Sequence, residues 1–336
     1  MWRIKTRCEA EEVRQEPVNF LEVLREWGCV WMWDDLEVVG GTEWIWKAIE
    51  NRSLVAVTDG SFIRELYPDV CSACFVMECT QGRGRLMGSF AEKSSAANAY
   101  RGELMGLMAV HLLLLSVNKL KPDLTGEVLI YSDCLGALMK VSELPPNRIP
   151  TRCKHSDVLK NILVNCSKLT FTRTYLHVDA HQDEDKEWDE MERPGQLNTI
   201  CDAGAKDKIY KVEEDSALKQ VIFPLEPICI FVNGKKMTSD TGPELRYAAH
   251  RVLAKDFFHD YKILFRNQFE EVAWREVHDA LETKAPKLFA LWACKQVMGV
   301  AATNEYLIRT GRGVNRSNKC PCCGVAEETA EHVLYC

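Results

Sequence analysis

The sequence has no long hydrophobic run and no apolar leader. Its longest apolar stretch, residues 104–117, spans 14 residues and is interrupted by Gly106 and His111. A membrane-spanning helix needs roughly 20 apolar residues, so this stretch predicts a buried helix and no membrane association. The first residues also lack the apolar segment of a signal peptide. We therefore expect an intracellular protein, cytoplasmic or nuclear.

Positive net charge is missing as well. The formal net charge of -7 argues against a protein that coats nucleic acid by charge alone. The charge is uneven, however: residues 145–176 hold six basic residues and one acid, and residues 183–192 hold seven acids and one lysine. The basic stretch is either a solvated face or a track for backbone phosphates.

Internal repeats and low-complexity tracts are absent, and the composition is that of a globular protein. Hydrophobic residues make up 46% of the 336 residues and charged residues 27%, which is ordinary for soluble domains. This length predicts two or three folded units. In a reducing compartment the fifteen cysteines are expected to be thiols or metal ligands and not disulfides.

Periodicity predicts a mixed α/β domain from Leu54 onward. Three antiparallel strands come first, and the later strands alternate with helices, which implies parallel pairing. The predicted elements are strands over 54–58, 71–79 and 85–90, a helix over 97–117, a strand over 128–132, helices from 135 and over 157–166, a strand over 170–178 and a helix over 196–208. Helical spacing of apolar residues between 243 and 299 predicts a small helical region.

Four carboxylates stand where a predicted strand ends or a predicted helix opens: Asp59, Glu103, Asp133 and Asp202, at intervals of 44, 30 and 69 residues. Asp59 could be a simple turn residue, and Asp202 a surface charge. Glu103 lies on an apolar helical face and Asp133 ends an apolar strand, where an unpaired charge is costly. Gathered in one pocket, the four would repel one another unless divalent cations lay between them.

These intervals and this order of elements resemble ribonuclease H, from about Leu54 to Lys208. The resemblance implies an α/β, ribonuclease H-like fold with a mixed five-stranded sheet in the order βββαβαβα. It also implies a metal-dependent endoribonuclease that cuts the RNA strand of RNA–DNA hybrids with two Mg²⁺ ions, Mn²⁺ being an alternative.

The resemblance assigns a role to each residue. Asp59 would bridge both metals, Asp202 would complete the site of the attacking water, and Glu103 with Asp133 would complete the site of the leaving 3′ oxygen. Asn198, four residues before Asp202, would position substrate, and His181 would assist proton transfer or product release. Asn198 follows His181 by seventeen positions, a longer loop than in compact relatives, and His177 lies close by. We also expect Arg148, Arg152 and Lys154 to contact substrate phosphates, in place of a separate basic insertion.

The carboxyl-terminal residues have the spacing of a zinc site. Cys320, Cys323, His332 and Cys336 form two close pairs of soft ligands, which suits one tetrahedral, structural Zn²⁺. Cys322 is a fifth candidate, and unligated thiols are the alternative. The segment resembles the zinc-binding segment of reverse transcriptases of non-LTR retrotransposons. Four basic residues just upstream, Arg309, Arg312, Arg316 and Lys319, would add affinity for nucleic acid.

We therefore expect a Trp-rich extension over 1–50, a ribonuclease H domain over 51–212, a linker and helical region over 213–305 and a zinc-binding tail over 306–336. This order resembles the carboxyl part of a retrotransposon polyprotein, in which an upstream reverse transcriptase would be a partner, or a cellular gene derived from one. Two other functions stay open: a catalytically silent nucleic-acid-binding module with the same fold, and a transposase-like DNA nuclease.

Overall fold

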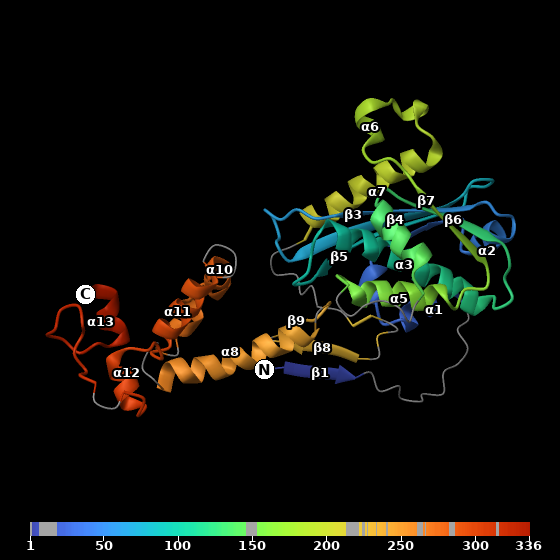
Figure 1. Ribbon diagram of the computed structural model, residues 1–336. Coiled ribbons are helices and arrows are strands. Elements are labelled where there is room, and N and C mark those ends of the chain that lie inside the picture. The colour runs from blue at the N-terminus through green and yellow to red at the C-terminus, as the bar shows by residue number, and fades with distance from the viewer. Residues whose placement is uncertain are drawn as a thin grey trace. The chain divides into compact units, whose positions relative to one another are not determined.

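A computed structural model describes residues 2–6, 19–145, 153–212, 222–223, 226, 228–232, 234–239, 241–260, 265, 267–281, 286–313 and 316–336. The chain divides into two compact units, Met1–Leu245 and Arg246–Cys336. The predicted division into four segments stays a prediction. Figure 1 shows the helices and strands of each unit.

A six-stranded mixed sheet organises the first unit, with the strand order β2-β5-β4-β3-β6-β7. Strands β3, β4 and β5 are antiparallel, and β6 and β7 continue the sheet in parallel with β3. The strands are β2 (Glu37–Val39), β3 (Leu54–Ser61), β4 (Val70–Cys79), β5 (Arg85–Lys93), β6 (Glu127–Ser132) and β7 (Thr172–His177). The order of strands and helices from β3 onward confirms the predicted ribonuclease H-like fold.

Helices cover both faces of this sheet, as Figure 1 shows. One face packs against α3 (Ala99–Leu120), α4 (Leu135–Glu143) and α5 (Ser156–Cys166). The other packs against α7 (Arg193–Tyr210) through Leu197, Cys201 and Ala205. Successive side chains of a strand point to opposite faces, so Val55 and Val57 meet α7 while Leu54 and Ala56 face α3.

Helix α3 is the central helix of this core. Its first turn is capped by Asn98, whose Oδ1 accepts a hydrogen bond of 2.8 Å from the Arg101 backbone amide. Among the described residues it is the one helix long and apolar enough to cross a membrane by length and composition, and 83% of its most apolar window is buried. The helix predicted over 97–117 is thus present and buried, and it ends three residues later than predicted, at Leu120.

Two predictions about the sheet were wrong. The sheet has six strands and not five, because β2 of the Trp-rich extension pairs with β5 through Val38 opposite Leu86. In addition, Asp59 does not follow its strand but lies inside it, since pairing with β4 continues as far as Ser61 opposite Ser72. The residues after Thr58 are polar and small, as in a turn, but strand pairing uses backbone groups, and these residues continue to pair with β4.

Residues 20–50 of the extension also pack on the core, through α1 (Phe20–Glu26), η1 (Val30–Met32) and α2 (Glu43–Glu50). Trp27 donates a 2.8 Å hydrogen bond from Nε1 to Ser116 Oγ of α3. Trp31 and Trp33 meet Phe90 and Phe75 edge to face, with ring centroids 5.3 and 6.1 Å apart. The tryptophans thus stabilise the domain by burial and aromatic contact.

A second, three-stranded sheet in the first unit joins β1 (Trp2–Thr6), β8 (Ile228–Val232) and β9 (Lys235–Lys236). It brings Lys236 to a buried network in which Nζ lies 3.3 Å from Asp157 and 2.6 Å from Glu226. Asp157 also accepts from Arg101, whose guanidinium pairs with Glu92 at 2.7 Å. The predicted linker therefore contributes charged side chains to the interior of the first unit.

The second unit is helical, as predicted. It contains most of α8 (Thr241–Asp260), with α9 (Gln268–Glu271), α10 (Trp274–Asp279), α11 (Lys287–Val297), α12 (Asn304–Arg309) and α13 (Ala330–Tyr335). Phe258, Phe269 and Trp274 pack together, with ring centroids between 4.7 and 6.0 Å apart.

Candidate functional site

Three of the four predicted carboxylates meet at one edge of the main sheet. Asp59 on β3, Glu103 on α3 and Asp133 directly after β6 each place one oxygen within 4.8 Å of the others. The sheet explains this meeting: β3 and β6 are parallel neighbours with Val57 opposite Tyr131, so the residues two positions further on leave the pair side by side. Carboxyl ends of parallel strands are where sites of α/β proteins commonly form.

Glu103 reaches the strand edge because two glycines let the helix approach. A Cβ on Gly60 would lie 2.2 Å from the Glu103 backbone nitrogen, and a Cβ on Gly102 would lie 2.6 Å from the Ser72 carbonyl oxygen. The close approach allows the Gly60 amide to donate a 2.9 Å hydrogen bond to Glu103 Oε1. Helix and strand are thus in backbone contact at the site, which holds the Glu103 carboxylate beside Asp59.

Burial and mutual repulsion disfavour the charged form of these acids. Burial, together with the charges of Asp133 and Asp202 and against hydrogen bonds from Glu103 and Gly60, raises the pKa of Asp59 to about 6. Burial and the charge of Asp59 raise the pKa of Glu103 well above its usual range. Burial also raises the pKa of Asp133, against the opposing charges of His181 and His177. Among the described residues, no lysine or arginine forms an ion pair with any of the three. The arrangement therefore suits a bound cation.

Asp202, the fourth predicted carboxylate, lies on α7 outside the group of three. Its Oδ2 accepts a 2.7 Å hydrogen bond from Lys206 Nζ, one helical turn away. Its charge still acts on Asp59, whose pKa it raises. The reasoning from sequence missed Lys206, although an acid four residues before a lysine on a predicted helix is a recognisable pair.

Asn198 is buried on the same helix, with 4% of its surface exposed. Its Oδ1 has no hydrogen-bond partner among the described residues. An unpaired buried amide oxygen costs free energy, so this group is available to a ligand or a water. Its predicted role with substrate stays a prediction.

Two histidines flank Asp133. His177 ends β7 beside Ser132, and its Nε2 donates to the Asp133 carbonyl oxygen at 3.0 Å. His181 lies in the left-handed region with φ 51° before α6 (Gln182–Asp185), and its Nδ1 is 3.8 Å from Glu184 Oε1. The His181 side chain is 57% exposed, whereas His177 is held against the backbone of the site. The more exposed His181 has the greater freedom to exchange protons with solvent.

The long acidic loop after His181 is folded. It contains α6 and the short helix η3 (Trp188–Glu190), and Gln196 donates a 2.8 Å hydrogen bond to the Trp188 carbonyl oxygen. Arg193 holds the start of α7 against β4 through two hydrogen bonds to Glu78, of 2.8 and 2.6 Å. The loop therefore has a defined path between β7 and α7.

Of the basic residues predicted to contact phosphates, Arg148 and Arg152 lie outside the described residues. Lys154 is exposed just before α5, where a phosphate can reach it. Its predicted contact with substrate stays a prediction.

The second unit brings the four predicted zinc ligands together. Cys320, Cys323, His332 and Cys336 each place one ligand atom within 4.8 Å of the others. Cys323 Sγ lies 3.4 Å from His332 Nε2, and Cys320 Sγ lies 3.8 Å from Cys336 Sγ. Backbone amides of Val325 and Ala326 lower the pKa of the Cys323 thiol to about 6, which favours the thiolate that a metal binds.

Local structure positions these ligands. Gly324, with φ +68°, turns the chain after Cys323, and the Gly324 amide donates to the Cys320 carbonyl oxygen at 2.8 Å. Thr329 caps α13 by accepting a 3.0 Å hydrogen bond from the His332 amide. Three cysteine sulfurs and one imidazole are soft donors, so the set fits zinc and not magnesium. Cys322 is exposed, and hydrogen bonds with Cys322 and Cys320 raise the pKa of Cys336 to about 12.

No protein-family model matches the sequence, and no curated protein sequence matches it either. Among solved structures, the chain is similar to the N-terminal RNase H domain of Rv2228c from Mycobacterium tuberculosis, which was solved as a fusion with maltose-binding protein. The identity is 17% and the TM-score 0.31, and the match covers 47% of this chain and 93% of that one. It is similar to RNase H1 of the halophilic archaeon Halobacterium salinarum NRC-1, with 12% identity, a TM-score of 0.30 and coverage of 47% and 98%. A third is the PFV RNase H domain in solution, with 16% identity, a TM-score of 0.36 and coverage of 48% and 96%.

Proposed function

We propose that the first unit is a divalent-metal-dependent endoribonuclease that cuts the RNA strand of RNA–DNA hybrids. One observation carries this proposal: three carboxylates from β3, α3 and the end of β6, two of them buried and one half-buried, converge within 4.8 Å at one edge of a ribonuclease H-like sheet. A core that needed only stability would gain nothing from three acids whose charges repel one another.

The donor set fits hard divalent cations. Asp59, Glu103 and Asp133 offer only oxygen ligands, with Asp202 beside them, and oxygen is what Mg²⁺ and Mn²⁺ prefer. When bound, two such ions activate a water and neutralise the leaving oxygen in phosphodiester cleavage. The three acids with raised pKa values are the residues that would hold them.

The chain's own groups would complete the reaction. His181, exposed beside Asp133, is an imidazole that could act as a general acid or base. Asn198 and Lys154 would bind the nucleic acid, and contacts to 2′-hydroxyls would distinguish the RNA strand. The choice of hybrid as substrate rests on the resemblance of the four-carboxylate pattern to ribonuclease H. A zinc-binding tail and a retrotransposon origin are part of the same proposal and rest on the Cys/His pattern.

A second candidate is a catalytically silent nucleic-acid-binding module. The pairing of Asp202 with Lys206 at 2.7 Å favours it, because a lysine that neutralises the fourth carboxylate competes with a cation there. In the enzyme, Lys206 would release Asp202 when metal and substrate bind.

The deciding experiment follows end-labelled RNA in an RNA–DNA hybrid, with and without Mg²⁺. We expect cleavage of the RNA strand only with the metal, and none of double-stranded DNA. Asp202→Asn should lower the rate strongly. Asp207→Asn is the matched control, because Asp207 pairs with Lys211 at the same spacing on the same helix and should leave the rate unchanged. Hybrid binding without cleavage under all metal conditions would establish the silent module instead.

A further inference from the structure

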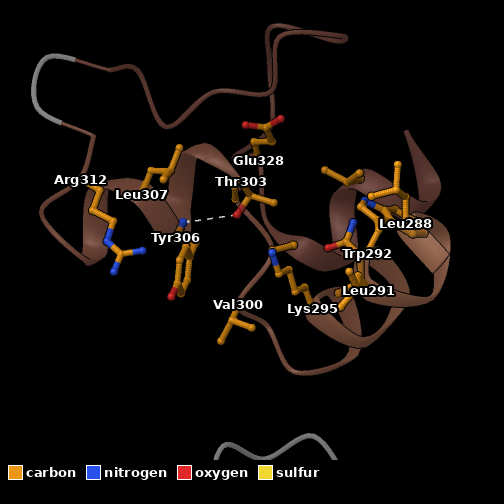
Figure 2. Close-up of a pocket in the computed structure, with 14 residues that line it drawn as sticks. Leu288, Leu291, Trp292, Lys295, Val300, Thr303, Tyr306, Leu307, Arg312 and Glu328 are labelled. Carbon is orange, nitrogen blue, oxygen red and sulfur yellow. Dashed lines mark hydrogen bonds between the residues drawn. The ribbon is translucent and has the colours of Figure 1, made fainter.

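A cavity of about 670 Å³ opens in the second unit between α11 and α12. Figure 2 shows Leu288, Leu291, Trp292 and Lys295 of α11 on one side, with Tyr306, Leu307 and Arg312 on the other. Cavities of this size take small organic groups. None of the acids proposed to bind metal lines it, and neither do the four Cys/His ligands.

The side of the cavity formed by α11 exposes large apolar groups. Leu288 is 82% exposed, Leu291 51% and Trp292 41%, and Phe289 packs on Trp292 with ring centroids 5.6 Å apart. Contiguous apolar surface of this kind marks a binding site. The aromatic rings provide flat faces on which a planar ligand can stack.

Gln296 supplies a polar group that lacks a partner. It lines the cavity with only 7% of its surface exposed, and its Oε1 accepts no hydrogen bond among the described residues. A buried carbonyl oxygen without a donor is costly. A ligand with an N–H group in the cavity would satisfy it.

The charge around the cavity favours an anion. Residues 287–319 contain six basic residues and one acid, in a chain of net charge -7. That acid, Glu305, pairs with Arg309 at 3.4 Å, while Lys295 and Arg312 line the cavity without an ion pair among the described residues. Glu328, the one carboxylate in the lining, accepts a 2.7 Å hydrogen bond from the Asn304 amide.

We propose that this cavity binds an unpaired base of a single-stranded nucleic acid. Trp292 and Tyr306 provide the stacking surfaces, Gln296 Oε1 accepts a hydrogen bond from an amino or ring N–H group of the base, and Lys295 with Arg312 contacts the adjoining phosphates. Aromatic rings and cations in one groove are the usual combination for single strands. The site is independent of hybrid cleavage, because it lies in the other unit and uses none of its residues.

The test measures fluorescence anisotropy of the full chain with labelled oligodeoxyadenylate of about 12 nucleotides, a length within the usual range of single-strand sites. An abasic oligomer of the same length carries the same phosphates and no bases. We expect it to bind about tenfold more weakly, as the loss of base stacking implies. Gln296→Leu, which preserves volume and removes the acceptor, should also weaken binding of the base-bearing strand about tenfold while retaining the fold by circular dichroism.

Two lysine variants that remove the same charge distinguish binding at this cavity from general electrostatic attraction of the strand to the protein. Lys295→Gln should weaken binding several-fold, whereas Lys287→Gln should not, because Lys287 is exposed at the start of the same helix and does not line the cavity. Equal binding of abasic and base-bearing strands, or equal effects of the two lysine variants, would overturn the proposal. A third result would also overturn it: the chain binds neither strand and self-associates in sedimentation, and Trp292→Ala abolishes the self-association. The apolar surface would then bind a second copy of the chain. Asp59→Asn should leave base binding unchanged. A failure of the cleavage proposal can therefore be told apart from a failure of the base-binding proposal.

Discussion

At the scale of single residues, Asp59 is the most informative position. It is buried, lies close to Glu103 and Asp133, and carries a pKa raised from 3.8 to about 6 by burial first and by neighbouring charge second. A group that binds its proton more tightly when folded stabilises the protein at low pH, and this contribution is lost as the pH rises.

We therefore predict that the protein without divalent metal loses stability as the pH rises from about 4 through 6. For Asp59 the loss is on the order of 3 kcal/mol. Asp59→Asn should flatten this dependence, be more stable than the wild type at pH above 7, and abolish cleavage. Urea unfolding across pH, with and without Mg²⁺, measures it. A variant that retains the wild-type slope, or the wild-type cleavage rate, would contradict the assignment.

His181 gives a second prediction at this scale. His181→Ala should slow turnover about 10² to 10⁴-fold without abolishing it, because a general acid or base contributes about that much. His177→Ala is the comparison, since His177 donates to the Asp133 backbone and should reduce stability as well as rate. Complete loss of cleavage in His181→Ala, or no effect, would move the proton-transfer role to His177 or to water. The pH–rate profile of each variant separates these outcomes.

At the scale of elements, the contact between β3 and α3 decides whether Glu103 reaches the site. Only hydrogen atoms fit between Gly60 and the backbone of Gly102 and Glu103. We predict that Gly60→Ala pushes the helix from the strand, costs about 1 to 3 kcal/mol, and lowers cleavage by more than the stability loss explains.

Gly136→Ala on α4 is the matched control. A Cβ there meets no atom within 4 Å, and alanine is the better helix former by about 1 kcal/mol. This variant should be as stable as the wild type or more so, with unchanged cleavage. Chemical unfolding and the hybrid assay test both. Full activity in Gly60→Ala would show that Glu103 is not needed where the glycines place it.

At the scale of the whole molecule, loss of zinc from the second unit should leave the cleavage activity of the first unit intact. We predict one zinc per chain, bound by Cys320, Cys323, His332 and Cys336, and lost in Cys323→Ser. Folding of so short a segment should depend on the metal. The variant should bind hybrid more weakly at higher salt, yet retain the metal-dependent cleavage of the first unit. Cys294→Ser, at another exposed thiol, should keep its zinc. Elemental analysis decides this, and a metal-free wild type purified from zinc-replete, reducing medium would refute the site.

The first unit itself should extend beyond the predicted boundary at residue 212. Burial would raise the pKa of Asp157, but the charges of Arg101 and Lys236 more than offset it and lower the pKa. A fragment that ends at Val212 lacks Lys236 and the buried Phe223. We predict that it unfolds at a lower temperature than a fragment ending at Leu245, since removing one partner of a buried ion pair costs about 3 to 5 kcal/mol. Equal melting temperatures would show that the second sheet adds no stability.

The sequence by itself determined the order of strands and helices, the three carboxylates that meet, and the Cys/His set. The elements depend on local periodicity, the carboxylates on the intervals between successive elements, and the Cys/His set on spacing within one short segment, and residue types express all of these directly. Tertiary structure alone decided the sixth strand, the backbone contact of Gly60 with α3, the pairing of β1 with β8 and the burial of Asn198. These depend on backbone pairing and packing between residues far apart in the sequence, and such contacts are only weakly encoded in the side chains of either partner.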